Sequence, residues 1–321
     1  MILEISPPYE IQDRLYLRDS AVDEAHRRHA FAIAMQLSQL GPKDVQTPHR
    51  YIRSIRSQHI FANCLAMFAR FLEVNRAGNL KRFPPDATSA YLFARSQRVG
   101  EAQLMSDYWA LELWTGEKLP RFKSTRPQCL KPRAYTAEQI AAIAAHQTEP
   151  YAFSTWLAAA IGLRGMELIT IGPLSEQPRD PRPIPPYLHA HMPPGKLYSV
   201  HGKGGLVRTV LVPLPFVDTL EARLRPSPIR VRHERSDLTS YYDIPGGKPW
   251  AASFTQACRR TFNKTAGAHG LRHTYTQERI DVLLGHSIPN RDARKAVSVE
   301  IGHFRLDVID IYLRGRWDPT A

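Results

Sequence analysis

Apolar residues recur every three to four positions along the first third of the chain, from about residue 20 to about residue 115. This spacing puts them on one face of an α-helix, and three such segments follow one another. Their apolar positions are Phe31, Ile33, Ala34, Leu37 and Leu40, then Ile60, Phe61, Cys64, Leu65, Phe68, Phe71 and Leu72, then Leu104, Met105, Tyr108, Trp109, Leu111 and Leu113. The pattern predicts a helical bundle whose aromatic rings fill its own core rather than stack on bases.

Residues 117–133, EKLPRFKSTRPQCLKPR, interrupt the helical pattern. Three prolines and six basic residues, with no acidic residue after Glu117, predict a linker that remains extended. The chain is therefore divided into a helical domain at 1–116, the linker at 117–133 and a second domain at 134–321. A basic linker is suited to cross a phosphate backbone, and it could equally be a solvated hinge.

Helices and strands are mixed in the second domain. A helical pattern begins at Thr136 and continues to Leu168. Residues 197–214 alternate between apolar and polar like two strands around a glycine-rich turn that carries Lys203, which predicts a β-hairpin. Helical spacing returns from Ala251 to the end of the chain.

Two stretches of the second domain are predicted to be loops. Eight prolines lie between Pro173 and Pro194, and residues 225–250 are polar with further prolines and glycines. The predicted fold class is thus mainly α with a small β-sheet: a helical N-terminal domain and a mixed α/β second domain.

The composition indicates which class of molecule the protein binds. Lysine and arginine number 43 against 30 acidic residues, which gives a net charge of +13, and so basic a chain attracts polyanions such as nucleic acid. The three cysteines, Cys64, Cys129 and Cys258, are too far apart for a disulfide framework or a metal site and are expected to be reduced thiols. The sequence shows no signal peptide and no apolar run long enough to span a bilayer, so a cytoplasmic, nucleoid-associated protein is expected.

Three short motifs in the second domain carry polar residues at defined spacings. They are GLRGMEL at 162–168, HGLRH at 269–273 and GHFRLDVIDIYL at 302–313. In the third motif a histidine precedes a tyrosine by nine residues. Each motif alone is equally well explained by ordinary surface or core residues.

Taken in this order, the motifs resemble the catalytic domain of the tyrosine recombinases, the family of the phage integrases. The family pattern is an arginine in G-[LI]-R-x-x-E-[LI], a lysine on a β-hairpin turn, H-x-L-R, and then G-H with a tyrosine nine residues on. The stretch RAYTAEQI at 133–140 is similar to the start of that domain, and the likeness covers about 131–321. The helical part before it resembles the family's core-binding domain. The matching positions are Arg164, Lys203, His269, Arg272, His303 and Tyr312.

The resemblance implies an enzyme that breaks and rejoins DNA strands through a 3′-phosphotyrosine intermediate. The chemistry independently requires such residue types. Tyr312 would be the nucleophile, and its covalent link to phosphate would store the bond for rejoining. Arg164 and Arg272 would clamp the charge that develops on the phosphate oxygens, because guanidinium groups are forked and permanently charged.

The remaining roles follow from the resemblance. Lys203 resembles the general acid that protonates the leaving 5′-oxygen, or it binds phosphate as a point charge. His269 resembles the residue that accepts or relays the tyrosine proton, and His303 resembles the one that hydrogen-bonds the scissile phosphate. Glu167 would orient Arg164, and an ordinary ion pair on a helix face is an equal alternative.

Two other assignments are rejected. The sequence LLGHS also contains a G-H pair, but nine residues after His286 stands Lys295 rather than a tyrosine. A metal hydrolase is disfavoured, because His269 with His273 and His189 with His191 lack an H-E-x-x-H motif or carboxylate cluster. We expect no metal, and no nucleotide cofactor either, because the chain lacks G-x-x-x-x-G-K-[ST].

The expected partner is double-stranded DNA. Strand exchange needs two duplexes and four cleavages, so we expect a homotetramer on DNA and a monomer in its absence. Accessory DNA-bending proteins are further possible partners. A protein of this kind is expected to be encoded by a mobile genetic element. The alternatives are a non-catalytic DNA-binding protein with the same fold and a type IB topoisomerase-like enzyme that relaxes DNA. Four features depart from the family pattern: the proline-rich stretch, the loop at 225–250, the long segment before Gly302, and only nine residues after Tyr312.

Overall fold

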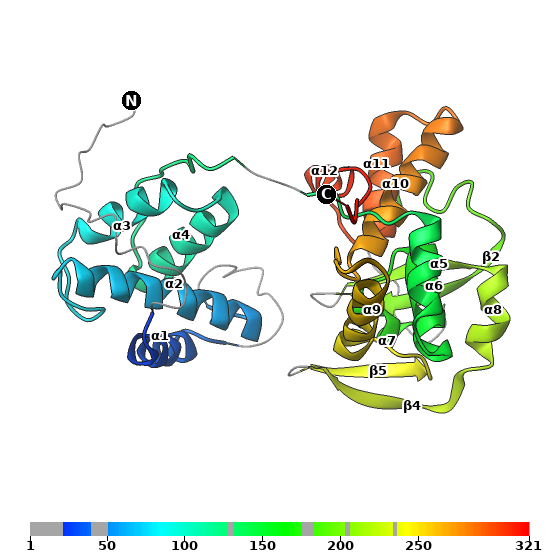
Figure 1. The fold of residues 1–321 in the computed structure, drawn as a ribbon, viewed down its shortest axis with the longest axis horizontal. Coiled ribbons are helices and arrows are strands. Elements are labelled where there is room, and N and C mark those ends of the chain that lie inside the picture. The colour runs from blue at the N-terminus through cyan, green and yellow to red at the C-terminus, as the bar shows by residue number, and fades with distance from the viewer. Residues whose placement is uncertain are drawn as a thin grey trace. The chain divides into compact units, whose positions relative to one another are not determined.

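The structure is a computed structural model of the chain. It describes residues 22–39, 51–127, 131–174, 183–202, 206–233 and 236–320 (Figure 1). Contacts divide the chain into two units, Met1–Cys129 and Leu130–Ala321, and the division falls inside the predicted linker. Among the described helices, none combines the length and the apolar character that crossing a bilayer requires.

The first unit is a bundle of helices. Its helices are α1 (Glu24–Gln36), α2 (Ile55–Val74), α3 (Ala87–Ser96) and α4 (Glu101–Thr115). Two begin at residues whose side chains accept a hydrogen bond from the first turn: Asp23 from the backbone N–H of His26, and Ser54 from that of Ser57. The last helix ends at Gly116, whose φ of 76° lies in the left-handed region that favours glycine.

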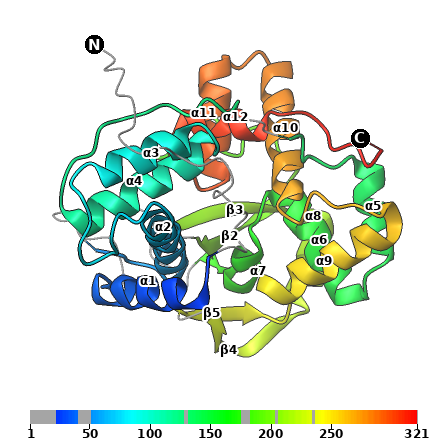
Figure 2. The same ribbon diagram turned by 60° about the vertical axis from the view of Figure 1, so that its left-hand side comes forward.

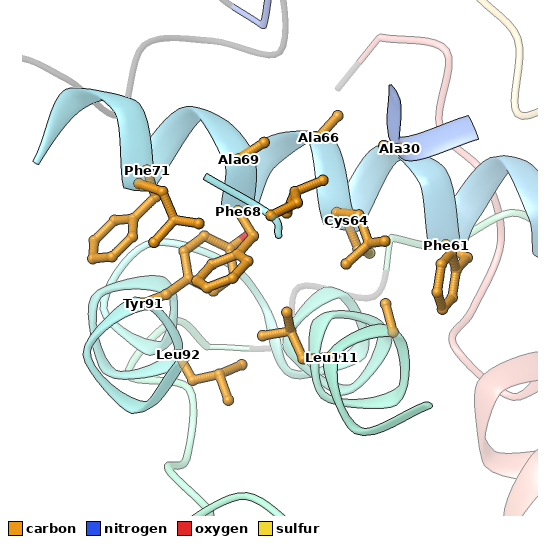
Figure 3. Packing of buried hydrophobic residues seen from close by; sticks show 14 of the residues in the cluster. Ala30, Phe61, Cys64, Ala66, Phe68, Ala69, Phe71, Tyr91, Leu92 and Leu111 are labelled. Atoms are coloured by element: carbon orange, nitrogen blue, oxygen red, sulfur yellow. The ribbon is translucent and has the colours of Figure 1, made fainter. Parts of the chain in front are cut away.

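Aromatic rings fill the core of this unit, as predicted. Phe68 and Tyr91 are fully buried and face each other with ring centroids 5.2 Å apart (Figure 3). Two residues assigned to the core are instead exposed: Ile60 at 38% and Met105 at 46%. Helical spacing alone did not separate them from the core face, because the helices carry apolar residues beyond the contacting stripe. Leu40 lies outside the described residues.

The first part of the predicted linker does not extend freely. The hydroxyl of Tyr108 donates to the carbonyl oxygen of Pro120 at 2.7 Å and accepts from the backbone N–H of Phe122 at 2.6 Å. Thr125 N–H donates to the carbonyl oxygen of Ser96 at 2.9 Å. These bonds hold residues 117–127 along the helical bundle, because extended backbone satisfies its polar groups on α3 and α4. Residues 128–130 lie outside the described part.

The second unit combines helices with two small antiparallel sheets, which confirms the predicted fold class. Its helices are α5 (Ala137–Ala145), α6 (Glu149–Ile161), α7 (Gly165–Thr170), α8 (Leu214–Glu221), α9 (Gly247–Phe262), α10 (Gly270–Gly285), α11 (Asn290–Glu300) and α12 (Ile309–Tyr312). Its strands are β1 (Gly172–Pro173), β2 (Gly195–His201), β3 (Val207–Pro213), β4 (Leu224–His233) and β5 (Ser236–Tyr242). Helices α10, α11 and α12 lie at one end and the β4–β5 hairpin at the other (Figures 1 and 2).

The predicted helix from Thr136 to Leu168 is three helices rather than one. Thr136 and Gln139 form a capping box that begins α5. Helix α6 ends at Gly162, which has a φ of 65°, and α7 follows after Arg164. A left-handed residue cannot continue an α-helix, so the chain turns sharply there.

The predicted hairpin at 197–214 is confirmed as β2 and β3, which pair from Gly195 with Pro213 to His201 with Val207. Lys203 lies outside the described residues, so its position on the turn stays a prediction. The base of the turn is closed by a hydrogen bond of 2.6 Å from Gly202 N–H to the carbonyl oxygen of Leu206.

The prediction of a loop at 225–250 is wrong. Residues 224–233 and 236–242 form the paired antiparallel strands β4 and β5, and α9 begins at Gly247. The register shifts between Leu224 and Ile229, the stretch that contains Pro226 and Pro228. Proline donates no ladder hydrogen bond, so these two residues hid the strand pattern in the sequence and interrupt the pairing in the structure.

Part of the proline-rich stretch is ordered against α10 and α11. Residues 175–182 lie outside the described part. In the remainder, His189 N–H donates to Glu300 Oε1 at 2.9 Å, and Arg279 donates to the carbonyl oxygen of Ala190 at 2.9 Å. His189 adopts a positive φ of 58°, a conformation that is uncommon outside glycine. The two hydrogen bonds offset the cost of that conformation.

Candidate active site

The predicted site residues that the structure describes converge from four parts of the second unit. Arg164 caps the start of α7, and Glu167 lies one turn into it. His269 and Arg272 belong to the first turn of α10. The last two are His303, in the loop after α11, and Tyr312, the final residue of α12.

A glycine turn places Arg164. Gly162 ends α6 in the left-handed region, and a Cβ atom there would lie 2.5 Å from the ring of Tyr275. Only glycine therefore lets α10 pack this close to the turn. The carbonyl oxygen of Gly162 accepts a hydrogen bond of 2.6 Å from Arg272 Nη1, which ties the two arginine-bearing segments together.

The carboxylate of Glu167 is fully buried and surrounded by arginines. Its Oε1 accepts from Arg164 Nη1 at 2.8 Å, and its Oε2 accepts from Arg208 Nη2 at 2.8 Å and lies 3.5 Å from Arg272 Nη1. Burial alone would raise the pKa of Glu167, but Arg208, Arg272 and Arg164 together hold that pKa down to about 2. The carboxylate is therefore ionised at neutral pH and fixes three guanidinium groups in one place.

Arg272 has donors left over. Its side chain is 0% exposed, yet Nε and Nη2 have no hydrogen-bond partner among the described residues. Three arginines face the single charge of Glu167, so the site carries an excess of two positive charges. Buried donors without an acceptor are rare in folded proteins and costly. The arrangement is suited to receive an anion with several oxygens.

The hydroxyl of Tyr312 lies between two histidines. It is 3.3 Å from His269 Nε2 and 3.3 Å from His303 Nε2. Arg164 Nη2 is 2.8 Å from the same His303 nitrogen. Because a guanidinium can only donate, His303 Nε2 is an acceptor and a neutral ring carries its proton on Nδ1. His269 can therefore accept the proton of Tyr312 directly, and His303 can do so only when Arg164 releases its Nε2.

Both histidines are neutral at pH 7. Desolvation, followed by the positive charge of Arg272, lowers the pKa of His269 to about 3 and the pKa of His303 to about 4. The His269 residue as a whole is exposed, but its Nε2 lies 3.3 Å from the Tyr312 hydroxyl. A neutral imidazole is the form that can remove a proton from a phenol.

Two solved structures are similar in fold to this chain over most of its length. The XerH site-specific recombinase bound to palindromic difH substrate, a post-cleavage complex, superimposes with a TM-score of 0.52 over 92% of this chain and 92% of that one, at 14% sequence identity. The lambda integrase (75–356) dimer bound to a COC′ core site gives a TM-score of 0.50 over 83% of this chain and 92% of that one, at 12% identity. The chain has the fold of the tyrosine recombinases. The resemblance read from the sequence is thereby confirmed at the level of the fold.

No protein-family model matches the chain, and no curated protein sequence does. At 12% and 14% identity the two structures establish the recombinase fold alone. The roles of individual residues rest on the geometry of the site.

The rejected G-H pair lies far from the site. His286 follows the last residue of α10, whereas His269 precedes the first, so about 25 Å of helix separates them at 1.5 Å per residue. The ring of His286 stacks on that of His191, with centroids 3.8 Å apart. The long segment before Gly302 forms α11, and it leaves Tyr312 beside His303.

The chain holds α12, which ends at Tyr312, in place with its own residues. Gln277 Nε2 donates to the carbonyl oxygen of Tyr312 at 2.8 Å. Beyond it, Arg316 Nη1 donates to the carbonyl oxygen of Tyr135 at 2.8 Å, and Trp317 N–H donates to that of Ala134 at 2.6 Å. The short tail after Tyr312 is thus anchored at the start of the recombinase-fold unit to which it belongs.

Sequence reasoning missed two residues of the site. Arg208 lies on β3, where the inward positions Val210 and Val212 are buried. A charged residue in register with buried valines was a usable signal. His273, considered only as part of a metal pair, packs its ring 4.6 Å from that of Tyr312. Desolvation, then the charge of Arg133, lowers its pKa to about 4.

One group of side chains in the described part of the chain could together ligate a metal ion: Asp23, His26 and Glu73, in the helical unit. Arg70 already forms an ion pair with Glu73. A cation would therefore compete with a resident guanidinium. The group is remote in sequence from the residues around Tyr312, and the expectation that the chain needs no metal stays a prediction.

Proposed function

We propose that this protein is a site-specific DNA recombinase that cleaves and rejoins strands through a 3′-phosphotyrosine intermediate. One observation carries the proposal: the hydroxyl of Tyr312 lies 3.3 Å from each of two neutral histidines, and the guanidinium of buried Arg272, with two unpaired donors, lies 5.9 Å from the centre of the Tyr312 ring. A phenol with a proton acceptor and a preorganised anion site are the two requirements for attack on a phosphodiester without a metal.

In the proposed step, the oxygen of Tyr312 attacks the phosphorus and passes its proton to a neighbouring imidazole. The bond from phosphorus to the 5′-oxygen breaks, and that oxygen leaves as a hydroxyl with a proton that Lys203 is proposed to supply. Arg272 and Arg164 hold the non-bridging oxygens, on which negative charge increases in the transition state. A 5′-hydroxyl from the same or another strand reverses the step and rejoins the DNA.

The proton of Tyr312 has two routes. In the structure Arg164 Nη2 donates to His303 Nε2, and Arg164 is the most exposed of the three arginines around Glu167, at 21% against 4% for Arg208 and 0% for Arg272. When Arg164 turns toward a bound phosphate, a His303 ring that carries its proton on Nε2 can donate to a phosphate oxygen, and His269 becomes the acceptor for the proton. This division matches the roles that the family resemblance implies for His269 and His303.

We also propose double-stranded DNA as the partner, a monomer in its absence and a homotetramer on two duplexes. XerH and lambda integrase are DNA-bound in the structures compared above, which supports the choice of partner. Phosphate contacts would supply most of the affinity, and base contacts together with DNA-bending proteins would supply the choice of site.

The test is a covalent adduct. The protein is incubated with nicked duplexes of randomised sequence, the mixture is denatured in detergent, and the DNA that remains on the protein is sequenced. We expect recovered duplexes to share a sequence and the linked peptide to contain Tyr312. Tyr312→Phe should yield no adduct, whereas Tyr275→Phe, which removes a hydroxyl from neighbouring α10, should still yield one.

The outcomes separate the alternatives. A wild-type protein that binds duplex DNA without any adduct would be a non-catalytic DNA-binding protein. Adducts without a shared sequence, together with relaxation of any supercoiled plasmid, would indicate a topoisomerase-like enzyme. Either result overturns the proposal.

A further inference from the structure

Arg208 is a charged side chain in the interior of the recombinase-fold unit. It projects from β3 among buried positions, and its side chain is 4% exposed. Burying a guanidinium is costly unless its donors are bonded and its charge is paired. The hydrogen-bond partners of Arg208 therefore indicate why a charged side chain is buried at this position.

The guanidinium joins two segments of the site. Nη2 donates to Glu167 Oε2 at 2.8 Å, and Nη1 donates to the carbonyl oxygen of Glu300, the last residue of α11. Glu167 is the carboxylate that holds Arg164, and Glu300 begins the turn that leads to His303. Arg208 thus links the arginine side of the site to the histidine side.

The turn itself is shaped around Arg208. Gly302 has a φ of 65°, and a Cβ atom there would lie 3.1 Å from Arg208 Nε and 3.2 Å from Arg208 Cδ. The glycine before His303 therefore lets the turn lie directly on the arginine. On the other side, a Cβ atom on Gly202, at the base of the β2–β3 turn, would lie 3.1 Å from Glu167 Oε1. The hairpin that carries Arg208 is seated against the same carboxylate.

We infer that Arg208 is a positioning residue that fixes the distance between the phosphate-binding arginines and His303, without itself touching DNA. The inference rests on the proposed function. A lysine could not replace it, because a single ammonium lacks the rigid fork that reaches a carboxylate and a carbonyl oxygen at once. A buried ion pair that merely stabilises the fold would not act on the reaction through Glu167, and this difference can be measured.

The experiment is a double-mutant cycle in single-turnover cleavage, on the duplex recovered with the wild-type protein. Arg208→Lys and Glu167→Gln should each slow cleavage about 10- to 100-fold through misplacement of the reacting groups, with duplex affinity within about threefold of wild type. The double variant should be at most about threefold slower than the slower single variant, because both changes break one link.

Arg279→Lys is the matched control. Arg279 is also buried in an ion pair, with the side chain of Glu300, and it donates to Ala190. The fold decreases in cleavage rate caused by Arg279→Lys and by Glu167→Gln should multiply when the two changes are combined. If Arg208→Lys does not fold, Arg208→Gln, which keeps two N–H donors without the charge, takes its place in the cycle.

The outcomes are distinct. The inference is overturned if the decreases in cleavage rate of Arg208→Lys and Glu167→Gln multiply in the double variant, or if Arg208→Lys cleaves at the wild-type rate. Either result leaves the proposed function intact. A wild-type protein that forms no adduct overturns the proposed function and the inference with it. A double variant no slower than the single ones supports Arg208 as the positioning residue.

Discussion

Buried charge is concentrated around Glu167. A carboxylate in the interior is stable only with close partners, and three arginines supply them. As a result, the site carries an excess of positive charge, and two N–H donors of Arg272 remain unpaired among the described residues. Such a site is incomplete until an anion enters, which is the arrangement expected where negative charge develops in a transition state.

Arg272→Lys tests whether the forked guanidinium of Arg272 is needed to bind the anion. An ammonium supplies a point charge but not the fork, so single-turnover cleavage should fall about 100- to 1,000-fold, as for the loss of an oxyanion donor. Duplex affinity, measured by fluorescence anisotropy, should change little, because most phosphate contacts lie elsewhere on a large footprint. Cleavage near the wild-type rate would contradict the clamp.

Histidine burial predicts how stability depends on pH. The pKa of His273 is about 4 in the folded protein, because desolvation and Arg133 disfavour its charged form, against 6.5 when unfolded. A lowered folded pKa means that the unfolded chain binds the proton more tightly. Stability from this residue is complete above pH 6.5 and is lost as the pH falls toward 4.

The measurement is the free energy of unfolding in urea between pH 7 and about pH 4. His273→Gln should remove up to about 3 kcal/mol of the decrease seen in wild type, which corresponds to 2.5 pKa units. His303 and His269 have lowered pKa values as well, so a smaller decrease should remain. An unchanged slope would show that His273 does not titrate in this way.

At the scale of elements, the turn between α6 and α7 is tightly constrained. Gly162 combines a φ of 65° with a would-be Cβ only 2.5 Å from Tyr275. Gly267, in the same unit, has a φ of 76° but a nearest neighbour at 3.8 Å. Substituting Gly267 therefore adds backbone strain alone, whereas substituting Gly162 adds both backbone strain and a steric clash.

Gly162→Ala should destabilise the protein clearly more than Gly267→Ala. The control carries only the left-handed penalty of about 1–2 kcal/mol, whereas Gly162→Ala adds overpacking of about 1–3 kcal/mol. Urea unfolding of both variants measures the difference. Equal losses would mean that α10 can move away from the turn at little cost.

Helix α12 is too short to be stable alone, since it spans only Ile309–Tyr312. Its position depends on bonds from outside, above all the two from Gln277 Nε2 to the carbonyl oxygens of Tyr312 and Gly315, at 2.8 and 3.2 Å. Tyr312 is therefore placed by α10 more than by its own helix.

Gln277→Leu keeps the side-chain size and removes those bonds. We expect single-turnover cleavage about 10- to 100-fold slower, because Tyr312 shifts relative to the phosphate, with duplex affinity within about twofold. Gln147→Leu is the control, since that half-buried glutamine bonds to Thr155 and Ser253 instead. Equal rates for the two variants would refute the role of Gln277.

At the scale of the whole molecule, the net charge of +13 predicts salt-sensitive binding to duplex DNA. If six to ten phosphates are contacted, affinity should fall about 10³- to 10⁵-fold between 50 and 200 mM salt, with log K linear in log salt concentration. Fluorescence anisotropy on the recovered duplex measures the slope. Weak dependence on salt would mean that the charge serves solubility rather than a phosphate backbone.

Local signals in the sequence predicted most of the elements and most of the site residues that the structure describes. Helical spacing predicted the bundle core around Phe68, and alternation predicted the β2–β3 hairpin. The motifs around Arg164, Arg272 and Tyr312 named residues that meet in the structure, because each motif is short and its spacing is set by a helix or turn. Proline hid the β4–β5 hairpin, since pairing between strands is a tertiary property that local pattern does not fix.

Only the tertiary structure revealed the connections between motifs. That Glu167 binds Arg208 and Arg272, across 41 and 105 residues, follows from packing between elements far apart in the chain. The same holds for Gln277 on Tyr312 and for the tail on Ala134. The sequence by itself determined which chemical groups this protein possesses. Their distances, their burial and therefore their charge states were decided by the fold, because desolvation and Coulomb interactions depend on neighbours in space.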